Sequence, residues 1–105
     1  MTVFGLLRVT PITEDDITED VAAAIDALEE YDVSYETTPM ATTLEADDVH
    51  ELFAACAAAH EAVDRAEVQT LLQVDEKPTE MRASDKVDAV EGALGREARS
   101  QRDAE

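Results

Sequence analysis

The sequence predicts an α+β domain in which helices cover a four-stranded antiparallel sheet. Four short segments are rich in β-branched, aromatic or other apolar residues, as strands are. Between them, two longer segments repeat apolar residues at the three- and four-residue spacing of a helix face. With 105 residues, the chain has room for one domain only.

The first predicted strand runs from Thr2 to Thr10 and is apolar on both faces apart from Arg8. A strand of this kind is normally central in its sheet and covered on both sides. Pro11 ends the strand, and then Asp16 or Thr18 is suited to cap the first helix. The apolar face of this helix consists of Ile17, Val21, Ala24, Ile25 and Leu28.

A strand, a bend and a second strand follow the first helix. Val33, Tyr35 and Thr37 alternate with more polar residues, and residues 40–44 have a similar character. Pro39, between the two runs, lacks an amide hydrogen and restricts the residue before it. Pro39 therefore marks either the bend between the strands or a position at a sheet edge.

The second predicted helix spans residues 47–65, and the last strand spans residues 68–74. A polar loop over 75–83 leads to a third helix, which Ser84 caps and Gly95 ends. The apolar face of the second helix consists of Val49, Leu52, Phe53, Cys56, His60 and Val63, and that of the third helix of Val87, Val90 and Leu94.

The predicted order of elements is β-α-β-β-α-β-α. Two right-handed crossovers around an antiparallel sheet give the ferredoxin-like split βαβ arrangement, here with one additional C-terminal helix. We assign residues 1–95 to a single ferredoxin-like domain and residues 96–105 to a charged C-terminal tail.

The composition is strongly acidic, with 26 Asp and Glu against 8 Lys and Arg and a formal net charge of −18. Nucleic acid and anionic membrane are therefore poor partners, because phosphate contacts need basic patches. The acids are spread over every predicted helix, and lysine is almost absent. This composition resembles that of proteins from salt-accumulating halophiles, where molar salt shortens the Debye length to about 3 Å and screens self-repulsion.

The single cysteine, Cys56, excludes an internal disulfide and a cysteine-based metal site. Acidic runs such as residues 14–16 have no EF-hand spacing and fit a solvated surface. No apolar run is long enough to cross about 30 Å of hydrocarbon, and no secretory leader precedes the first strand. We therefore expect a cytoplasmic protein without metal or cofactor.

Alternation along the strands assigns one sheet face to the helices and leaves the other face open. The helix-side residues are Val3, Leu7, Val9, Val33, Tyr35, Val68, Leu72 and Val74, and the open face carries Phe4, Leu6, Arg8, Glu36, Thr38, Thr43, Gln69, Leu71 and Gln73. An apolar patch such as Phe4, Leu6 and Leu71 is usually buried by a partner. We predict a homodimer or homotetramer whose interface includes these three residues and Arg8. Arg8 pairs with Glu36, pairs with a partner's acid or touches a ligand, and the sequence leaves these alternatives open.

The hairpin segment YETTPMATTLE (35–45) resembles the strand-turn-strand signature of the small thiamine-binding domain family, the archaeal and bacterial UPF0045 proteins. Three further segments follow in the family's order and spacing, VAAAIDALEE (21–30), HEAV (60–63) and DKVDAVEGAL (85–94). Ala41 and Ala46 stand where the family usually has glycine, and the segment DEKP after the last strand lacks an expected arginine.

The resemblance implies a site for thiamine or its hydroxymethylpyrimidine precursor. Such a site needs an acceptor for the amino group, a donor to the ring nitrogen, and apolar walls. The implied ligand-binding residues are Thr38, Met40, Thr42, Thr43 and Glu45 from the hairpin, with Gln73 and Asp75 from the last strand. The residues alone also fit a plainer interpretation, in which the threonines reflect β-propensity and Glu45 reflects the negative charge favoured before a helix.

Non-enzymatic binding by a homo-oligomer adapted to high salt is thus the predicted function. The alternative is a regulatory or scaffolding subunit that recruits another protein through its open sheet face. An enzyme fits least, because no GxGxxG, P-loop, HExxH or GxSxG motif is present and no nucleophile and base stand at usable spacing. Cys56 is most simply a small core residue, and His60 a satisfied, partly buried histidine.

Overall fold

The computed structural model describes residues 1–78 and 82–99, so most of the expected tail lies outside the described residues. The elements are β1 (Thr2–Pro11), α1 (Thr18–Ala27), a 3-10 turn (Leu28–Glu30), β2 (Ser34–Thr37), β3 (Thr42–Ala46), α2 (Val49–Ala62), β4 (Val68–Lys77) and α3 (Ala83–Leu94). The four strands form one antiparallel sheet in the order β2-β3-β1-β4. This is the ferredoxin-like arrangement that the sequence predicts, with β3 and β1 as the two central strands.

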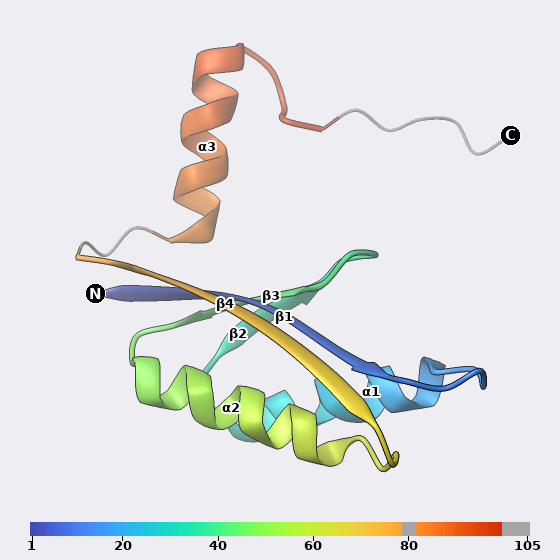
Figure 1. The fold of residues 1–105 in the computed structure, drawn as a ribbon. Helices are drawn as coiled ribbons and strands as arrows, with labels where there is room; N and C mark the ends of the chain where they lie inside the picture. Colours follow the sequence, from blue (N-terminus) through green and yellow to red (C-terminus); the bar gives the residue numbers. More distant parts are fainter. Residues whose placement is uncertain (79–81, 100–105) are drawn as a thin grey trace, which may run out of the picture.

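Helices α1 and α2 lie side by side on one face of the sheet, and α3 stands on the opposite side and points away from it (Figure 1). The core fills the space between the sheet and the first two helices. Its fully buried side chains include Val3, Leu28 and Leu52. A Cβ atom at position 5 would lie only 3.2 Å from Cδ1 of Leu52, so Gly5 lets α2 approach β1 closely.

The predicted division of the sheet into two faces is confirmed, except that Thr38, predicted on the open face, lies in the bend after β2 and not on the sheet. Val3 and Leu7 belong to the core cluster, and the other helix-side residues, Val9, Val33, Tyr35, Val68, Leu72 and Val74, pack against it. On the open face, Leu71 is 52% exposed and Arg8 is also exposed, while Phe4 and Leu6 are half-buried. The protomer therefore leaves an apolar surface on the face opposite α1 and α2.

Several boundaries differ from the prediction. β4 continues to Lys77 instead of ending at residue 74, because residues 75–77 complete the pairing with the start of β1. α2 covers 49–62 and not 47–65, and the carboxylate of Asp48 caps it by accepting the amide of His50 at 3.0 Å.

The starts of the other two helices also differ from the prediction. α1 has Ile17 at its N-cap, although the carboxylate of Asp16 accepts the amide of Thr18 at 3.0 Å. α3 begins one residue before Ser84 and has Arg82 at its N-cap.

Phe53 and His60 were wrongly assigned to the apolar face of α2. Phe53 is 52% exposed, and His60 is exposed with Nδ1 hydrogen-bonded to the hydroxyl of Thr70 on β4. The buried residues of this helix are Leu52, Ala55, Cys56 and Ala59. Small side chains thus line most of the contact, which lets the helix lie near the sheet.

The apolar face of α3 is present but is not covered within the protomer. None of the residues of α3 is buried, and Val87, Val90 and Leu94 are 50%, 53% and 47% exposed. Gly95, with φ of 76°, ends the helix in the left-handed conformation, as predicted.

Truncating two neighbouring residues of α2, one buried and one exposed, tests which side of this helix faces the sheet. Leu52→Ala should lower the free energy of unfolding by about 2–5 kcal/mol, because it removes a fully buried side chain and leaves a cavity. Phe53→Ala is the matched control and should cost less than about 1 kcal/mol, since its ring is half exposed. Denaturant titrations followed by circular dichroism in 3 M KCl measure both; equal losses would contradict the orientation of α2.

Candidate ligand-binding site

A notch opens in the sheet where β3 begins. β1 pairs with β4 up to Pro11 but with β3 only up to Leu7, so the last part of β1 has no neighbour on the β3 side. The end of β1 and the bend of the β2–β3 hairpin diverge there (Figure 1). The notch has a volume of about 190 Å³ and is lined by residues 7–10 of β1, Ile17 and Val21 of α1, and residues 37–42 of the hairpin.

The backbone of Val9 faces into this gap in the sheet. The amide of Ile12 donates to the carbonyl of Glu67 at 2.9 Å, on the β4 side of the chain. Backbone groups alternate between the two sides of an antiparallel strand, so the amide and carbonyl of Val9 point to the β3 side. Since the β3 pairing has ended by this point, the notch offers one backbone donor and one backbone acceptor next to each other.

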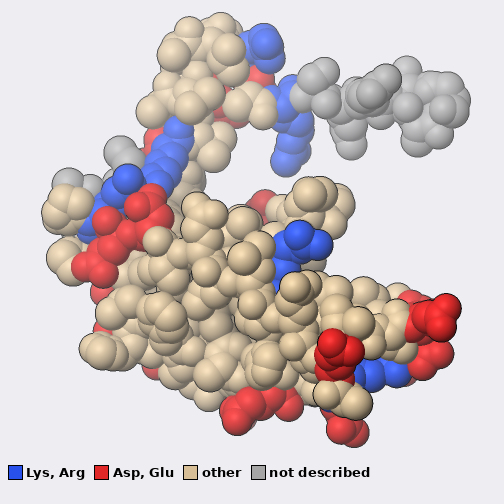
Figure 2. Space-filling model, in the orientation of Figure 1, with Lys and Arg blue, Asp and Glu red and all other residues tan. Residues whose placement is uncertain are grey.

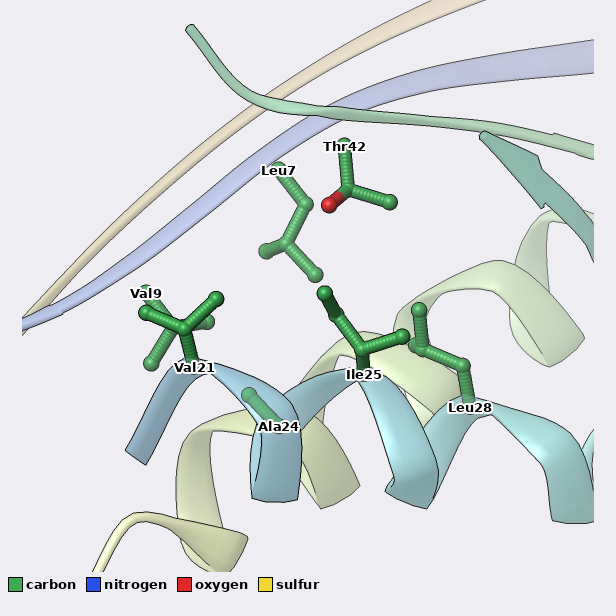
Figure 3. Close-up of a pocket in the computed structure, with 7 residues that line it drawn as sticks. All are labelled: Leu7, Val9, Val21, Ala24, Ile25, Leu28 and Thr42. Carbon is green, nitrogen blue, oxygen red and sulfur yellow. The ribbon is translucent and has the colours of Figure 1, made fainter. Parts of the chain in front are cut away.

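The floor of the notch is apolar. A smaller cavity of about 30 Å³ lies between the sheet and α1, and it shares Leu7, Val9, Val21 and Thr42 with the notch. Figure 3 shows Val21 and Ile25 of α1 pointing up towards Leu7 and Thr42 of the sheet. The hydroxyl of Thr42 is the only polar side-chain atom in that view, so a ring seated in the notch would rest on aliphatic groups.

Thr38 organises the bend that forms the rim of the notch. Its hydroxyl donates to the carbonyl of Ala41 at 2.8 Å and accepts the amides of Met40 at 3.3 Å and Ala41 at 3.2 Å. The amide of Thr38 also donates to the carbonyl of Ala41 at 2.8 Å. The Thr38 hydroxyl, which the family resemblance implies as a ligand contact, is therefore already used by the turn. Pro39 lies in this bend and not in a strand.

Arg65 holds the α1 side of the notch in place. Its guanidinium donates hydrogen bonds to both carboxylate oxygens of Asp20 at 3.1–3.3 Å and to one carboxylate oxygen of Asp15 at 3.0 Å. The hydrogen bonds to these two acids raise the pKa of Arg65 above its ordinary value. Because Ile17 lies between the two acids, the contact ties the start of α1 to the segment that follows α2.

A second hollow, the cleft, lies between α3 and the open sheet face. Its volume is about 550 Å³, and its lining includes Phe4, Thr43 and Glu45 from the sheet and Lys86 and Val87 from α3. The ammonium of Lys86 lies 4.0 Å from the centre of the Phe4 ring. The cleft is large enough for a small ligand.

Glu45 on the cleft lining and Asp75 beside it on β4 are occupied by groups of the chain itself, whereas Glu36, the other acid of the lining, is exposed. Glu45 accepts the amide of Ala83 at 2.8 Å and a guanidinium hydrogen of Arg82 at 3.0 Å, so it anchors the first turn of α3. Asp75 pairs with Lys77 at 3.3 Å and with Lys86 at 3.6 Å. Neither acid is left as a free acceptor for an amino group.

The residues predicted to bind a ligand do not converge on one place. Thr38, Met40 and Thr42 line the notch, and Thr43 and Glu45 line the cleft. On β4, Asp75 lies opposite Phe4 and Gln73 opposite Leu6 in the ladder. Their binding roles stay a prediction. Sequence reasoning missed the backbone of Val9 and the wall formed by Ile17 and Val21, because the register between strands is not visible in the sequence.

Comparison with known proteins identifies the family. A family model described as thiamine-binding protein matches residues 6–91. The chain belongs to this family. A UPF0045 protein of Methanothermobacter thermautotrophicus is 46% identical over 74 residues, which are 67% of this chain and 75% of that protein. Both findings confirm the resemblance carried by the hairpin segment.

Solved structures with the same fold are also similar. A hypothetical protein of Methanocaldococcus jannascii matches with a TM-score of 0.78 and 30% identity, over 85% of this chain and 95% of that one. A Thermotoga maritima protein, assigned provisionally to thiamine biosynthesis or salvage, matches with a TM-score of 0.73 and 22% identity, over 86% and 99% of the two chains. These matches confirm the fold class.

Other reactive groups lie apart from both hollows. Cys56 is a free, buried thiol, and burial raises its pKa to about 11, so it stays protonated at neutral pH.

Among residues 1–78 and 82–99, no group of three or more His, Cys, Asp or Glu is placed to hold a metal ion. In the same part of the chain, no helix has both the length and the apolar character needed to cross a membrane.

The anchoring of α3 by Glu45 gives a direct test. Glu45→Ala should speed amide hydrogen exchange in α3 by about 3- to 30-fold, because losing a helix cap typically costs about 0.5–2 kcal/mol. Exchange in α2 should stay unchanged. Glu36→Ala, an exposed acid on the neighbouring strand, is the matched control and should alter neither helix. An unchanged α3 in the Glu45 variant would refute the anchoring role.

Proposed function

We propose that the protein binds thiamine or its hydroxymethylpyrimidine precursor in the notch, without catalysing a reaction on it. The observation that carries this proposal is the unpaired backbone of Val9 above an apolar floor, in a chain of the thiamine-binding family. The notch lining contains no Asp, Glu, His or Cys, which favours binding over acid–base chemistry there.

An aminopyrimidine matches the groups that the notch offers. Its amino group donates a hydrogen bond and the adjacent ring nitrogen accepts one, and the carbonyl and amide of Val9 are the complementary pair. Ile17 and Val21 would contact the ring face and its methyl group. The recognition thus comes from a strand edge, as in peptide binding to open sheet edges, and not from the threonine hydroxyls.

Size also points to the pyrimidine as the part held in the notch. About 190 Å³ is below the roughly 300–1,000 Å³ typical of sites that enclose a whole small ligand. A single ring fits, whereas the rest of thiamine would extend beyond the rim. The larger cleft is the weaker candidate, because Glu45 on its lining already binds Arg82 and the other acid of the lining, Glu36, is exposed to solvent.

Blocking the notch tests the proposal. Ile17→Trp should weaken binding of hydroxymethylpyrimidine and thiamine at least about 10-fold, because the indole would fill the space beside Val9. Ile12→Trp is the control, since Ile12 is 49% exposed and lies outside the notch. Isothermal titration calorimetry in 3 M KCl measures both variants. No heat from the unmodified protein at millimolar ligand, or equal affinities of the two variants, would overturn the proposal.

We also propose that the protein works as a homodimer or homotetramer and in concentrated salt. The support is the uncovered apolar surface on the open face together with the uncovered stripe of α3. The net charge of −18 opposes close approach of two copies, and molar salt screens this repulsion. Association should therefore be strong in 3 M KCl and weaker in 0.1 M KCl.

Leu71 and Phe53 form a matched pair for this part of the proposal. Both are 52% exposed, but Leu71 lies on the open face and Phe53 on α2. Leu71→Gln should shift the mass measured by light scattering in 3 M KCl towards the monomer, whereas Phe53→Gln should leave it unchanged. A monomeric unmodified protein in 3 M KCl would contradict self-association and would favour recruitment of a different protein.

A further inference from the structure

Arg8 differs from every other basic side chain of the folded part. Within residues 2–78 and 82–94, each other Lys or Arg is paired with an acid: Arg65 with Asp15 and Asp20, Lys77 and Lys86 with Asp75, and Arg82 with Glu45 and Asp47. In the same part of the chain, no carboxylate lies within 4.0 Å of the guanidinium of Arg8, and Glu36 is not its partner. An unpaired cation is unexpected where acids outnumber bases 26 to 8.

Arg8 and Thr10 stand between two hollows. Both residues line the notch, and both line an outer hollow of about 220 Å³ on the open face, together with Gln69, Thr70 and Leu71. Because the two residues flank Val9 along β1, they lie beside the backbone groups that would hold the pyrimidine ring. A substituent leaving that ring towards the open face would reach the guanidinium.

The surroundings of Arg8 suit an anion. No Asp or Glu lines the notch or the outer hollow in the described part of the chain, and the side chains of Thr10 and Gln69 can both donate hydrogen bonds. Figure 2 shows acidic atoms mainly around the rim of the molecule, with a largely neutral centre. Within residues 2–78 and 82–94, the two hollows beside the unpaired guanidinium of Arg8 are thus lined without acids.

We propose that Arg8, with Thr10 and Gln69, forms a phosphate subsite next to the notch, so that the physiological ligand is a phosphate ester of the pyrimidine or of thiamine. A guanidinium presents a planar fork of donors that matches two phosphate oxygens. The chain's overall charge disfavours extended polyanions, which leaves a small phosphorylated metabolite as the matching class. This inference rests on the function proposed above, since the notch holds the ring and the subsite its phosphate.

Ligand pairs that differ only by the phosphate test the inference. In calorimetry at 3 M KCl, hydroxymethylpyrimidine phosphate and thiamine monophosphate should bind about 10- to 100-fold more tightly than their unphosphorylated forms, as expected for charge-assisted hydrogen bonds. Arg8→Gln should abolish this preference, so that each phosphorylated form binds no more tightly than its unphosphorylated counterpart. Arg8→Lys should restore part of it, and Arg96→Gln, the same change beyond α3, should have no effect.

The outcomes separate this inference from the function it rests on. Equal affinity of the unmodified protein for both members of each pair would overturn the phosphate subsite and leave pyrimidine binding intact. Inorganic phosphate is the second probe; its binding by the unmodified protein but not by Arg8→Gln would support the subsite even if no pyrimidine bound. If Arg8→Gln only lowered the mass of the assembly and kept the phosphate preference, Arg8 would be an intersubunit ion-pair residue and the inference would be wrong.

Discussion

The pairing of β1 with β4 is the interaction on which the rest of the structure depends. The two strands are matched from Thr2 opposite Lys77 to Pro11 opposite Val68, whereas β3 meets only the first half of β1. Because β3 is shorter than β1, the last part of β1 has a strand neighbour only on the β4 side. The notch lies there, where the backbone of β1 is hydrogen-bonded to β4 on one side and unpaired on the other.

In this arrangement, the proposed binding site of a small acidic domain consists of backbone and aliphatic groups without specialised side chains. The site groups are the amide and carbonyl of one residue, a wall of aliphatic side chains and a turn closed by its own threonine. Arg65 fixes the position of that wall from outside through Asp15 and Asp20. Rigid support of this kind lowers the entropy lost when a ligand is ordered, since the site is formed before the ligand arrives.

The sequence predicted the fold well because local and long-range signals agreed. Helical spacing, the Pro39 bend and Gly95 each marked a feature that the structure contains, and alternation along the strands assigned both sheet faces correctly apart from Thr38. Phe53 was misplaced because it follows Leu52 directly and alanines come after it, so the hydrophobic pattern of α2 did not distinguish the contact side. β4 was predicted too short because DEK is polar, and its pairing with β1 depends on a strand more than sixty residues away.

The candidate site was harder to predict for a physical reason. Side-chain chemistry drew attention to Thr38 and Glu45, but the structure uses both internally, one to close a turn and the other to begin a helix. The groups left unused belong to the backbone of Val9, and which backbone groups remain unused depends on where pairing between strands stops. The residue at which pairing stops is set by the register of the sheet, and no residue type in the sequence marks it.

The isolated position of Arg8 has a consequence for how the protein would meet charged molecules. At a distance, a small anion experiences the repulsion of the whole acidic surface, while in concentrated salt that field decays within about 3 Å. Attraction to the guanidinium is then felt only at contact, after the uncharged part of the molecule has already been seated. The fit of the ring would act first and charge second, so a phosphate joined to a fitting ring would be held longer than free phosphate.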